Sequence, residues 1–99
     1  MNNIISNLDK SFESRVRLGI MSILMVNDSI NFNDLKSILE VTDGNLASHL
    51  KALEKEFYIE VKKQFIGRKP NTSYLATDFG KKAFGDHLKA LETLIGGVG

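Results

Sequence analysis

Residues 31–57 read NFNDLKSILEVTDGNLASHLKALEKEF, and this stretch decides the fold. Asn31 and Thr42 each stand where a helix can begin, because their side chains can accept a hydrogen bond from a free backbone N–H of the first turn. Apolar residues recur at helical spacing after each of them. Residues Glu40–Thr42 join the two segments. Two short helices with so tight a link predict a helix-turn-helix unit.

The second helix of this unit, predicted over residues 43–56, has two unlike faces. Leu46, Leu50 and Leu53 repeat at the spacing of one helical face, so we expect them to face the core. The opposite face is small, polar and basic, and such a narrow face can enter the major groove of duplex DNA. The members of this outer face are Gly44, Asn45, Ala47, Ser48, Lys51 and Lys55.

The residue types of the outer face suggest separate contacts with DNA. Gly44 has no side chain, so the backbone can approach the duplex closely there. Asn45 can present its amide to adenine, and Ser48 can contact a base or a phosphate. Lys51 and Lys55 lie further along the helix, where we expect them near the phosphate backbone.

Residues 58–73, YIEVKKQFIGRKPNTS, change from helical to strand periodicity. They predict a β-hairpin with a turn or loop at Gly67–Asn71. The segment Val61–Ser73 has four positive charges and no acidic residue on a chain of net charge +1. Such a patch suits the phosphate backbone, although a solvated lysine-rich hairpin stays open as the alternative. The expected contacts are Lys62, Lys63, Arg68 and Lys69, with Arg68 able to enter a minor groove.

The remaining segments complete one predicted domain of residues 1–99. We expect a helix over residues 14–27, a very short strand at Ser29–Ile30, and a last helix capped by Thr77. The order helix, strand, helix, helix, strand, strand, helix defines the fold class, mainly α with a small β-hairpin (α+β), and the architecture of a winged helix-turn-helix. Residues 96–99 are expected to form a loose tail.

The last helix carries an apolar stripe over residues of about 84–95. The stripe can belong to the core of the chain itself, but a chain of 99 residues has few elements left to cover it. We therefore expect it to pack against a second copy of the chain. The first helix has a second apolar face, which can form part of the same interface. The predicted dimer interface consists of Phe84, Leu88, Leu91, Ile95 and Met21.

The residue types present argue against an enzyme and against a metal site. The chain has no cysteine and two histidines that lie far apart in the sequence. We interpret His49 as a half-buried side chain that braces the turn, with a phosphate contact as the alternative, and His87 as a surface residue. Phosphate loops, metal-binding pairs and activated nucleophiles are absent, so we expect neither cofactor nor metal. Without a signal peptide or a long apolar run, we expect a cytoplasmic protein.

Short segments between Arg15 and Ile95 resemble, in the right order, small single-domain winged helix-turn-helix transcriptional regulators of the MarR/ArsR group. The resemblance implies a homodimer that binds double-stranded DNA. In it, residues Asp43–Ser48 lie in the major groove, and the basic hairpin of residues 61–73, called the wing, lies on the flanking backbone or minor groove. The resemblance also implies that the contacts between the wing and DNA include residues Arg68–Thr72. The segments are Arg17–Ile20, Phe32–Lys36, Thr42–Glu54, Tyr58–Lys62, Gly67–Tyr74 and Thr77–Gly80. The candidates that the resemblance adds are Asn71 and Thr72.

One residue departs from the pattern of these regulators. In these regulators the recognition helix, which corresponds to residues 43–56 here, usually ends at a glycine in a left-handed conformation. Phe57 occupies the position of that glycine. Another residue there would be strained by about 1 kcal/mol, so we expect the helix to end differently, with Phe57 packed inward.

A second function stays open, because a fold does not determine a function. The chain can instead be a winged-helix protein-interaction module within a larger assembly. That role predicts an exposed apolar patch on the second helix of the unit, and the sequence shows none there.

Overall fold

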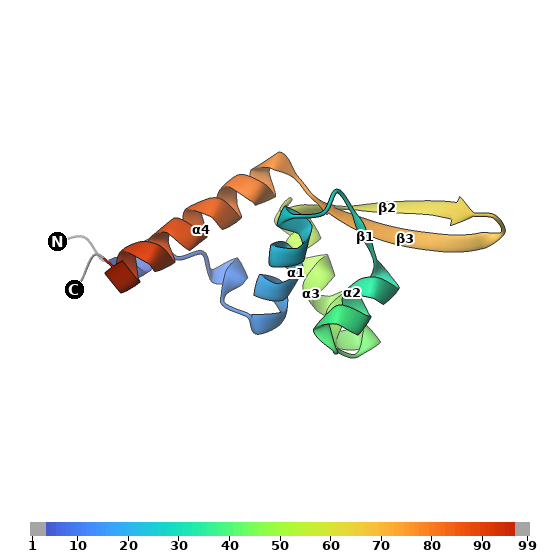
Figure 1. Cartoon of the computed structure of the whole chain (residues 1–99), viewed down its shortest axis with the longest axis horizontal. Helices are drawn as coiled ribbons and strands as arrows, with labels where there is room; N and C mark the ends of the chain where they lie inside the picture. The colour runs from blue at the N-terminus through green and yellow to red at the C-terminus, as the bar shows by residue number, and fades with distance from the viewer. Residues whose placement is uncertain (1–3, 97–99) are drawn as a thin grey trace.

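A computed structural model describes residues 4–96, with the side chains from Ile5 onward (Figure 1). The predicted order of elements and the winged helix-turn-helix fold are confirmed. None of the described helices is long and apolar enough to cross a membrane. The helices are α1 (Arg15–Met25), α2 (Phe32–Leu39), α3 (Asp43–Lys55) and α4 (Asp78–Gly96). The strands are β1 (Ile30–Asn31), β2 (Ile59–Ile66) and β3 (Lys69–Ala76), and the 3₁₀ helices η1 (Ile4–Asn7) and η2 (Lys10–Phe12) precede α1.

The predicted helix caps are confirmed. Asn31 Oδ1 accepts a hydrogen bond of 2.8 Å from the backbone N–H of Asp34, and Thr42 Oγ1 accepts one of 3.2 Å from that of Asn45. Thr77 Oγ1 accepts a bond of 2.9 Å from Gly80 N–H. Each cap fixes the first turn of a helix by pairing one of its free donors. The last helix includes Gly96, and the rest of the predicted tail lies outside the described residues.

The three strands form an antiparallel sheet in the order β1-β3-β2. Ile66 pairs with Lys69, so the turn consists of Gly67 and Arg68 alone, and Gly67 has a φ of +67°. The predicted turn at residues 67–71 is therefore too long. Pro70 lies within β3, opposite Phe65, at a point where β1 does not reach. Proline fits there because no third strand lies beside it that would need a hydrogen bond from its missing N–H.

The core lies among α1, α2, α3, the base of the hairpin and the first half of α4. It contains Phe12, Ile20, Met21, Leu24, Leu35, Leu46, Leu50, Leu53, Tyr58, Ile59, Ala76 and Phe84. The prediction that Met21 and Phe84 contact a second copy is wrong, because these side chains are only 0% and 2% exposed within the chain. Phe12, from the segment before α1, covers Phe84 at a ring distance of 5.1 Å.

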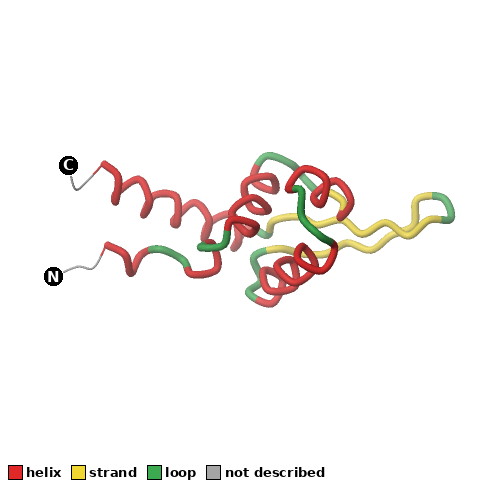
Figure 2. The backbone as a smooth tube through the Cα atoms, turned by 90° about the horizontal axis from the view of Figure 1, so that it is seen from below, coloured by secondary structure: helices red, strands yellow, loops and turns green. Residues whose placement is uncertain are grey.

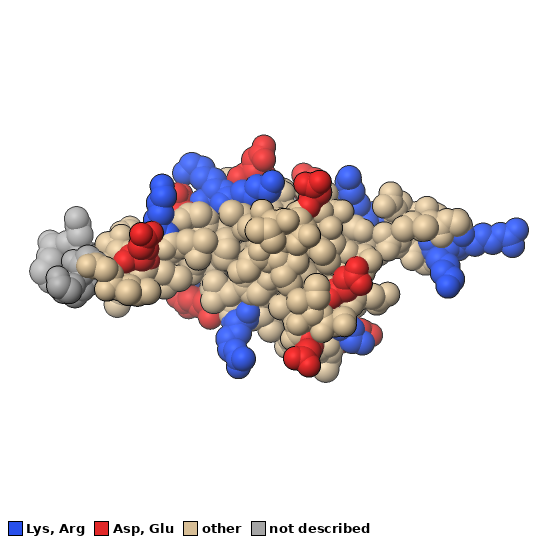
Figure 3. Space-filling model, viewed as in Figure 1, with Lys and Arg blue, Asp and Glu red and all other residues tan. Residues whose placement is uncertain are grey.

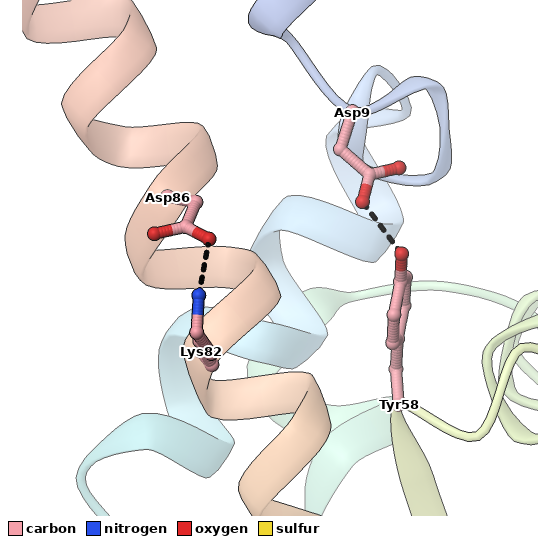
Figure 4. Close-up of polar contacts among 4 residues, drawn as sticks. All are labelled: Asp9, Tyr58, Lys82 and Asp86. Atoms are coloured by element: carbon pink, nitrogen blue, oxygen red, sulfur yellow. Dashed lines mark hydrogen bonds and ion pairs between the residues drawn. The ribbon is translucent and has the colours of Figure 1, made fainter.

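The N-terminal segment runs beside α4 (Figure 2) and is fastened by Asp9. Tyr58 Oη donates a 2.6 Å hydrogen bond to Asp9 Oδ2 (Figure 4), and the Asp9 backbone N–H donates to His87 Nδ1 at 3.0 Å. Burial first, and then the bond to Asp9, raise the pKa of Tyr58 to about 12. His87 is 3% exposed, so its prediction as a surface residue is wrong. The segment before α1 thus covers part of α4, and the apolar periodicity of the sequence does not reveal this contact.

The end of α3 also differs from the expectation. Phe57 adopts the left-handed conformation, with a φ of +64°, and its side chain is 75% exposed. Phe57 N–H donates to the Glu54 carbonyl at 2.9 Å, and Tyr58 N–H donates to the Leu53 carbonyl at 3.0 Å. These two bonds form a Schellman motif, the ending that glycine usually permits. The predicted inward packing of Phe57 and the predicted different helix ending are therefore wrong.

Candidate nucleic-acid interface

Helix α3 presents the polar face that its sequence predicts. Leu46, Leu50 and Leu53 are buried at 0%, 2% and 0% exposure, so they hold the helix against the core. The opposite side is open to solvent and carries no large apolar side chain. The exposed members of this outer face are Gly44, Asn45, Ala47, Ser48, Lys51 and Lys55.

Gly44 is not required by the packing of the protein. A Cβ atom added to Gly44 would meet no heavy atom within 4 Å. Gly80 is the opposite case, because a Cβ atom there would overlap the Tyr58 carbonyl group, on which the first turn of α4 packs. The packing within the chain would therefore accept a side chain at position 44.

Two polar contacts hold α3 in place. Lys36 Nζ lies 2.8 Å from Asp43 Oδ1 and joins α2 to the start of α3. This pair is exposed, so it contributes little to stability. Arg17 Nε donates a 3.0 Å hydrogen bond to His49 Nδ1, which joins α1 to the middle of α3.

The His49 contact has consequences for charge. Burial first, and the neighbouring Arg17 charge second, lower the pKa of His49. His49 is therefore neutral at pH 7, and its ring acts as an acceptor for Arg17. The expected half-burial of His49 is confirmed, but its hydrogen bond leads to Arg17 of α1 and not to the turn between α2 and α3. Sequence reasoning missed Arg17, because no local pattern links residues 32 positions apart.

The wing gathers positive charge at its outer part. Figure 3 shows blue and tan atoms at the end of the wing on the visible face, without acidic side chains. Lys62 and Lys63 are exposed and consecutive along β2, so they point to opposite faces of the hairpin. Arg68 and Lys69 are exposed at the turn. The wing is thus positive on both faces.

Asn71 and Thr72 lie opposite Gln64 and Lys63 in the middle of the hairpin, further from the tip than Arg68 and Lys69. Both are half-buried, and Asn71 Nδ2 donates a 3.0 Å hydrogen bond to Ser73 Oγ. Their side chains are therefore less accessible than the four cations of the wing. The structure does not group them with the tip of the hairpin.

The candidate residues form two patches rather than one cluster. The outer face of α3 extends about 16 Å from Gly44 to Lys55, at a rise of about 1.5 Å per residue. The wing cations extend about 13 Å along the hairpin, from Lys62 to the Ile66–Lys69 pair that closes it, at about 3.3 Å per residue. Such lengths suit an extended ligand more than a small molecule. Within the described part of the chain, no three acidic or histidine side chains gather as metal ligands.

A helix-turn-helix followed by a basic β-hairpin defines a winged helix-turn-helix domain, a class of DNA-binding protein. Residues 16–95 match the family model described as a winged helix DNA-binding domain. The match covers most of the chain, and the chain belongs to this family.

Three known proteins are similar to this chain. A protein of Methanocaldococcus jannaschii is 39% identical over 79 residues, which cover 80% of this chain and 86% of the relative. The solved structure of a transcriptional regulator homologue from Pyrococcus horikoshii OT3 is 33% identical, covers 89% of this chain and 87% of its own, and has a TM-score of 0.82. A MarR-family protein from Porphyromonas gingivalis W83 shares the fold, with 19% identity, coverage of 88% and 84%, and a TM-score of 0.66.

Family and structural likeness agree with the resemblance found in the sequence. The chain is a DNA-binding transcriptional regulator of the winged-helix class, similar in fold to MarR-family proteins.

Proposed function

We propose that this regulator recognises a specific sequence of double-stranded DNA, with α3 in the major groove and the wing on the flanking backbone or minor groove. The outer face of α3 carries the proposal, because it is exposed, small and polar. Asn45 and Ser48 would contact base edges, and Gly44 would let the backbone come close. Lys51 and Lys55 would pair with phosphates.

The wing supplies the second contact. Lys62, Lys63, Arg68 and Lys69 would each neutralise a phosphate and release a counterion, so affinity should fall steeply with salt. Asn71 and Thr72, which are half-buried in the middle of the hairpin, would contact the duplex less than the exposed cations do. This division assigns specificity to α3 and much of the salt dependence to the wing.

Fluorescence anisotropy with duplexes selected from a random pool tests this proposal. The double variant Arg68→Ala/Lys69→Ala should weaken binding to every duplex and reduce the slope of log affinity against log salt by about two. The matched control is Lys81→Ala/Lys89→Ala, which removes the same charge from exposed positions on α4. Equal losses for the two double variants, or no binding to any duplex at low salt, would overturn the proposal.

Base recognition by α3 has its own test. Asn45→Ala should relax the preference at one base pair, with a loss of about 1–3 kcal/mol against the preferred site and little loss against random DNA. Selection of bound duplexes with each protein shows which position changes. An unchanged preference would exclude Asn45 as a base-reading residue.

We further propose that the active form is a homodimer joined through α4. Leu88 and Ile95 are 44% and 83% exposed, and Leu91 is half-buried between them. Sedimentation should find dimers for the natural chain and monomers for Leu88→Lys/Ile95→Lys, which should also bind DNA less tightly. Val26→Lys, at an 81% exposed position directly after α1, is the control. A monomer that still binds DNA fully would contradict the dimer.

The alternative of a protein-interaction module gains no support from α3. No described residue of α3 is an exposed large hydrophobic, and such a patch is what a protein partner would need. We assign the chain no enzymatic activity and a role in the cytoplasm, where its DNA target would lie.

A further inference from the structure

The outer part of the wing carries apolar side chains that the described chain leaves exposed. Phe65 is 73% exposed and Ile66 is 65% exposed, whereas Ile59, at the base of the same strand, is 2% exposed. The register pairs Phe65 with Pro70, so these two share one face of the hairpin, and Ile66 lies on the other. Exposed apolar side chains on a strand promote aggregation, so proteins rarely keep them without a use.

Positive charge surrounds this apolar tip. Lys63, Arg68 and Lys69 are exposed beside it, and no acidic residue occurs between Val61 and Ser73. An apolar protein partner would bury these cations without compensation. A nucleic acid would pair with them and release counterions. Charge complementarity therefore favours duplex DNA as the occupant of the tip.

The shape of the tip suits a narrow groove. The hairpin extends about 23 Å from Ile59 to Ile66 at about 3.3 Å per residue, so its end projects well beyond the core. Figure 1 shows the wing and α4 at opposite ends of a molecule that measures 57 × 25 × 21 Å. The turn has only two residues, one of which is Gly67 without a side chain. A minor groove about 6 Å wide can receive such a turn.

We propose that Phe65 and Ile66, one on each face of the tip, act as apolar wedges that the wing presses into the minor groove beside Arg68. The inference rests on the proposed function, because the wing must lie on the duplex. Apolar wedges partly unstack a base step and kink the duplex toward the major groove. Pyrimidine–purine steps such as TA and CA/TG unstack most readily, so the wedge selects sites with such a step beneath the tip.

The test measures DNA bending and affinity with the full chain. A selected duplex with fluorophores at both ends reports the bend, and its partner replaces the TA or CA/TG step beneath the wing with a stiff A-tract. The natural chain should bend the first duplex by about 20° or more and bind it about tenfold more tightly than the second. Phe65→Ala/Ile66→Ala should lose the bend and the preference. Phe65→Leu should retain much of both, because leucine also acts as a wedge.

Two controls separate the wedge from the general contact of the wing. Phe79→Ala removes a 60% exposed aromatic ring from α4 and should leave bend and preference unchanged. Arg68→Ala/Lys69→Ala should weaken binding to both duplexes alike. If Phe65→Ala/Ile66→Ala binds and bends as the natural chain does, the wedge is overturned while the proposed function stands. A change in oligomeric state with unchanged bending would instead assign the patch to a second copy of the chain.

Discussion

At the scale of single residues, Gly44 and Phe57 each break a local rule of helix formation. Gly44 lies in the first turn of α3, although no neighbour requires its small size. Phe57 adopts a φ of +64°, a conformation that favours glycine. Glycine thus stands where the fold would accept alanine, and phenylalanine stands where the fold would favour glycine.

Gly44→Ala should stabilise the protein and weaken its binding to DNA. Alanine favours the helix by up to about 1 kcal/mol, and its methyl group meets open space in the free protein. On DNA the same methyl group would separate the backbone from the duplex. Urea unfolding and anisotropy measure the two effects.

Gly85→Ala is the matched control for Gly44→Ala. Gly85 lies in α4, and a Cβ atom added there also meets nothing within 4 Å. This variant should gain similar stability and keep its DNA affinity. If Gly44→Ala also keeps its full affinity, α3 does not approach the duplex through Gly44.

Phe57→Gly should stabilise the protein by about 1 kcal/mol, because glycine adopts the left-handed conformation without strain. Little apolar burial is lost, since the ring is 75% exposed. Phe57→Ala removes the ring but keeps the strain, so it separates the two effects. Chemical denaturation should rank the glycine variant above the alanine variant. Equal stabilities would mean that the strain at this position is negligible.

At the scale of elements, the bond between Arg17 and His49 fixes α3 against α1. The bond needs an unprotonated Nδ1, because Arg17 is the donor. Protonation of His49 would place a second donor against the guanidinium group. The orientation of α3 therefore depends on a neutral histidine.

The stability of the protein should fall as the pH drops below about 6.5. His49 has a pKa below the ordinary histidine value of 6.5, so the unfolded chain binds protons before the folded one does, and acid favours unfolding. His49→Gln should weaken this dependence. An NMR titration of the His49 ring measures the pKa directly, and a value at or above 6.5 would contradict the role of Arg17.

The hairpin shows how far local patterns reach. Alternation and turn residues predict the strands, and the charge of Val61–Ser73 predicts their basic character. The length of the turn is not predicted, because Pro70 argues for a loop until the partial cover by β1 is known. The sequence likewise does not predict that Phe65 is exposed. Strand propensity predicts a strand there but does not show how far along it the core extends.

At the scale of the whole molecule, the helix caps and the apolar periodicity of α3 predict the fold and the outer face. Long-range contacts are not predicted. Phe12, Asp9 and His87 pack the N-terminal segment on α4, and this packing buries Phe84 within the chain. Apolar periodicity does not predict a contact between Asp9 and His87, which are 78 positions apart in the sequence. The candidate dimer surface is therefore smaller than the sequence suggested.

The central claim is that α3 and the wing together form the DNA-binding surface. The most direct test is a map of backbone amide shifts, recorded by NMR for the full chain with and without a selected duplex. We expect the largest changes at residues 43–55 and 62–69 and small changes at residues 81–95. Changes concentrated in α4, with α3 and the wing unaffected, would contradict it.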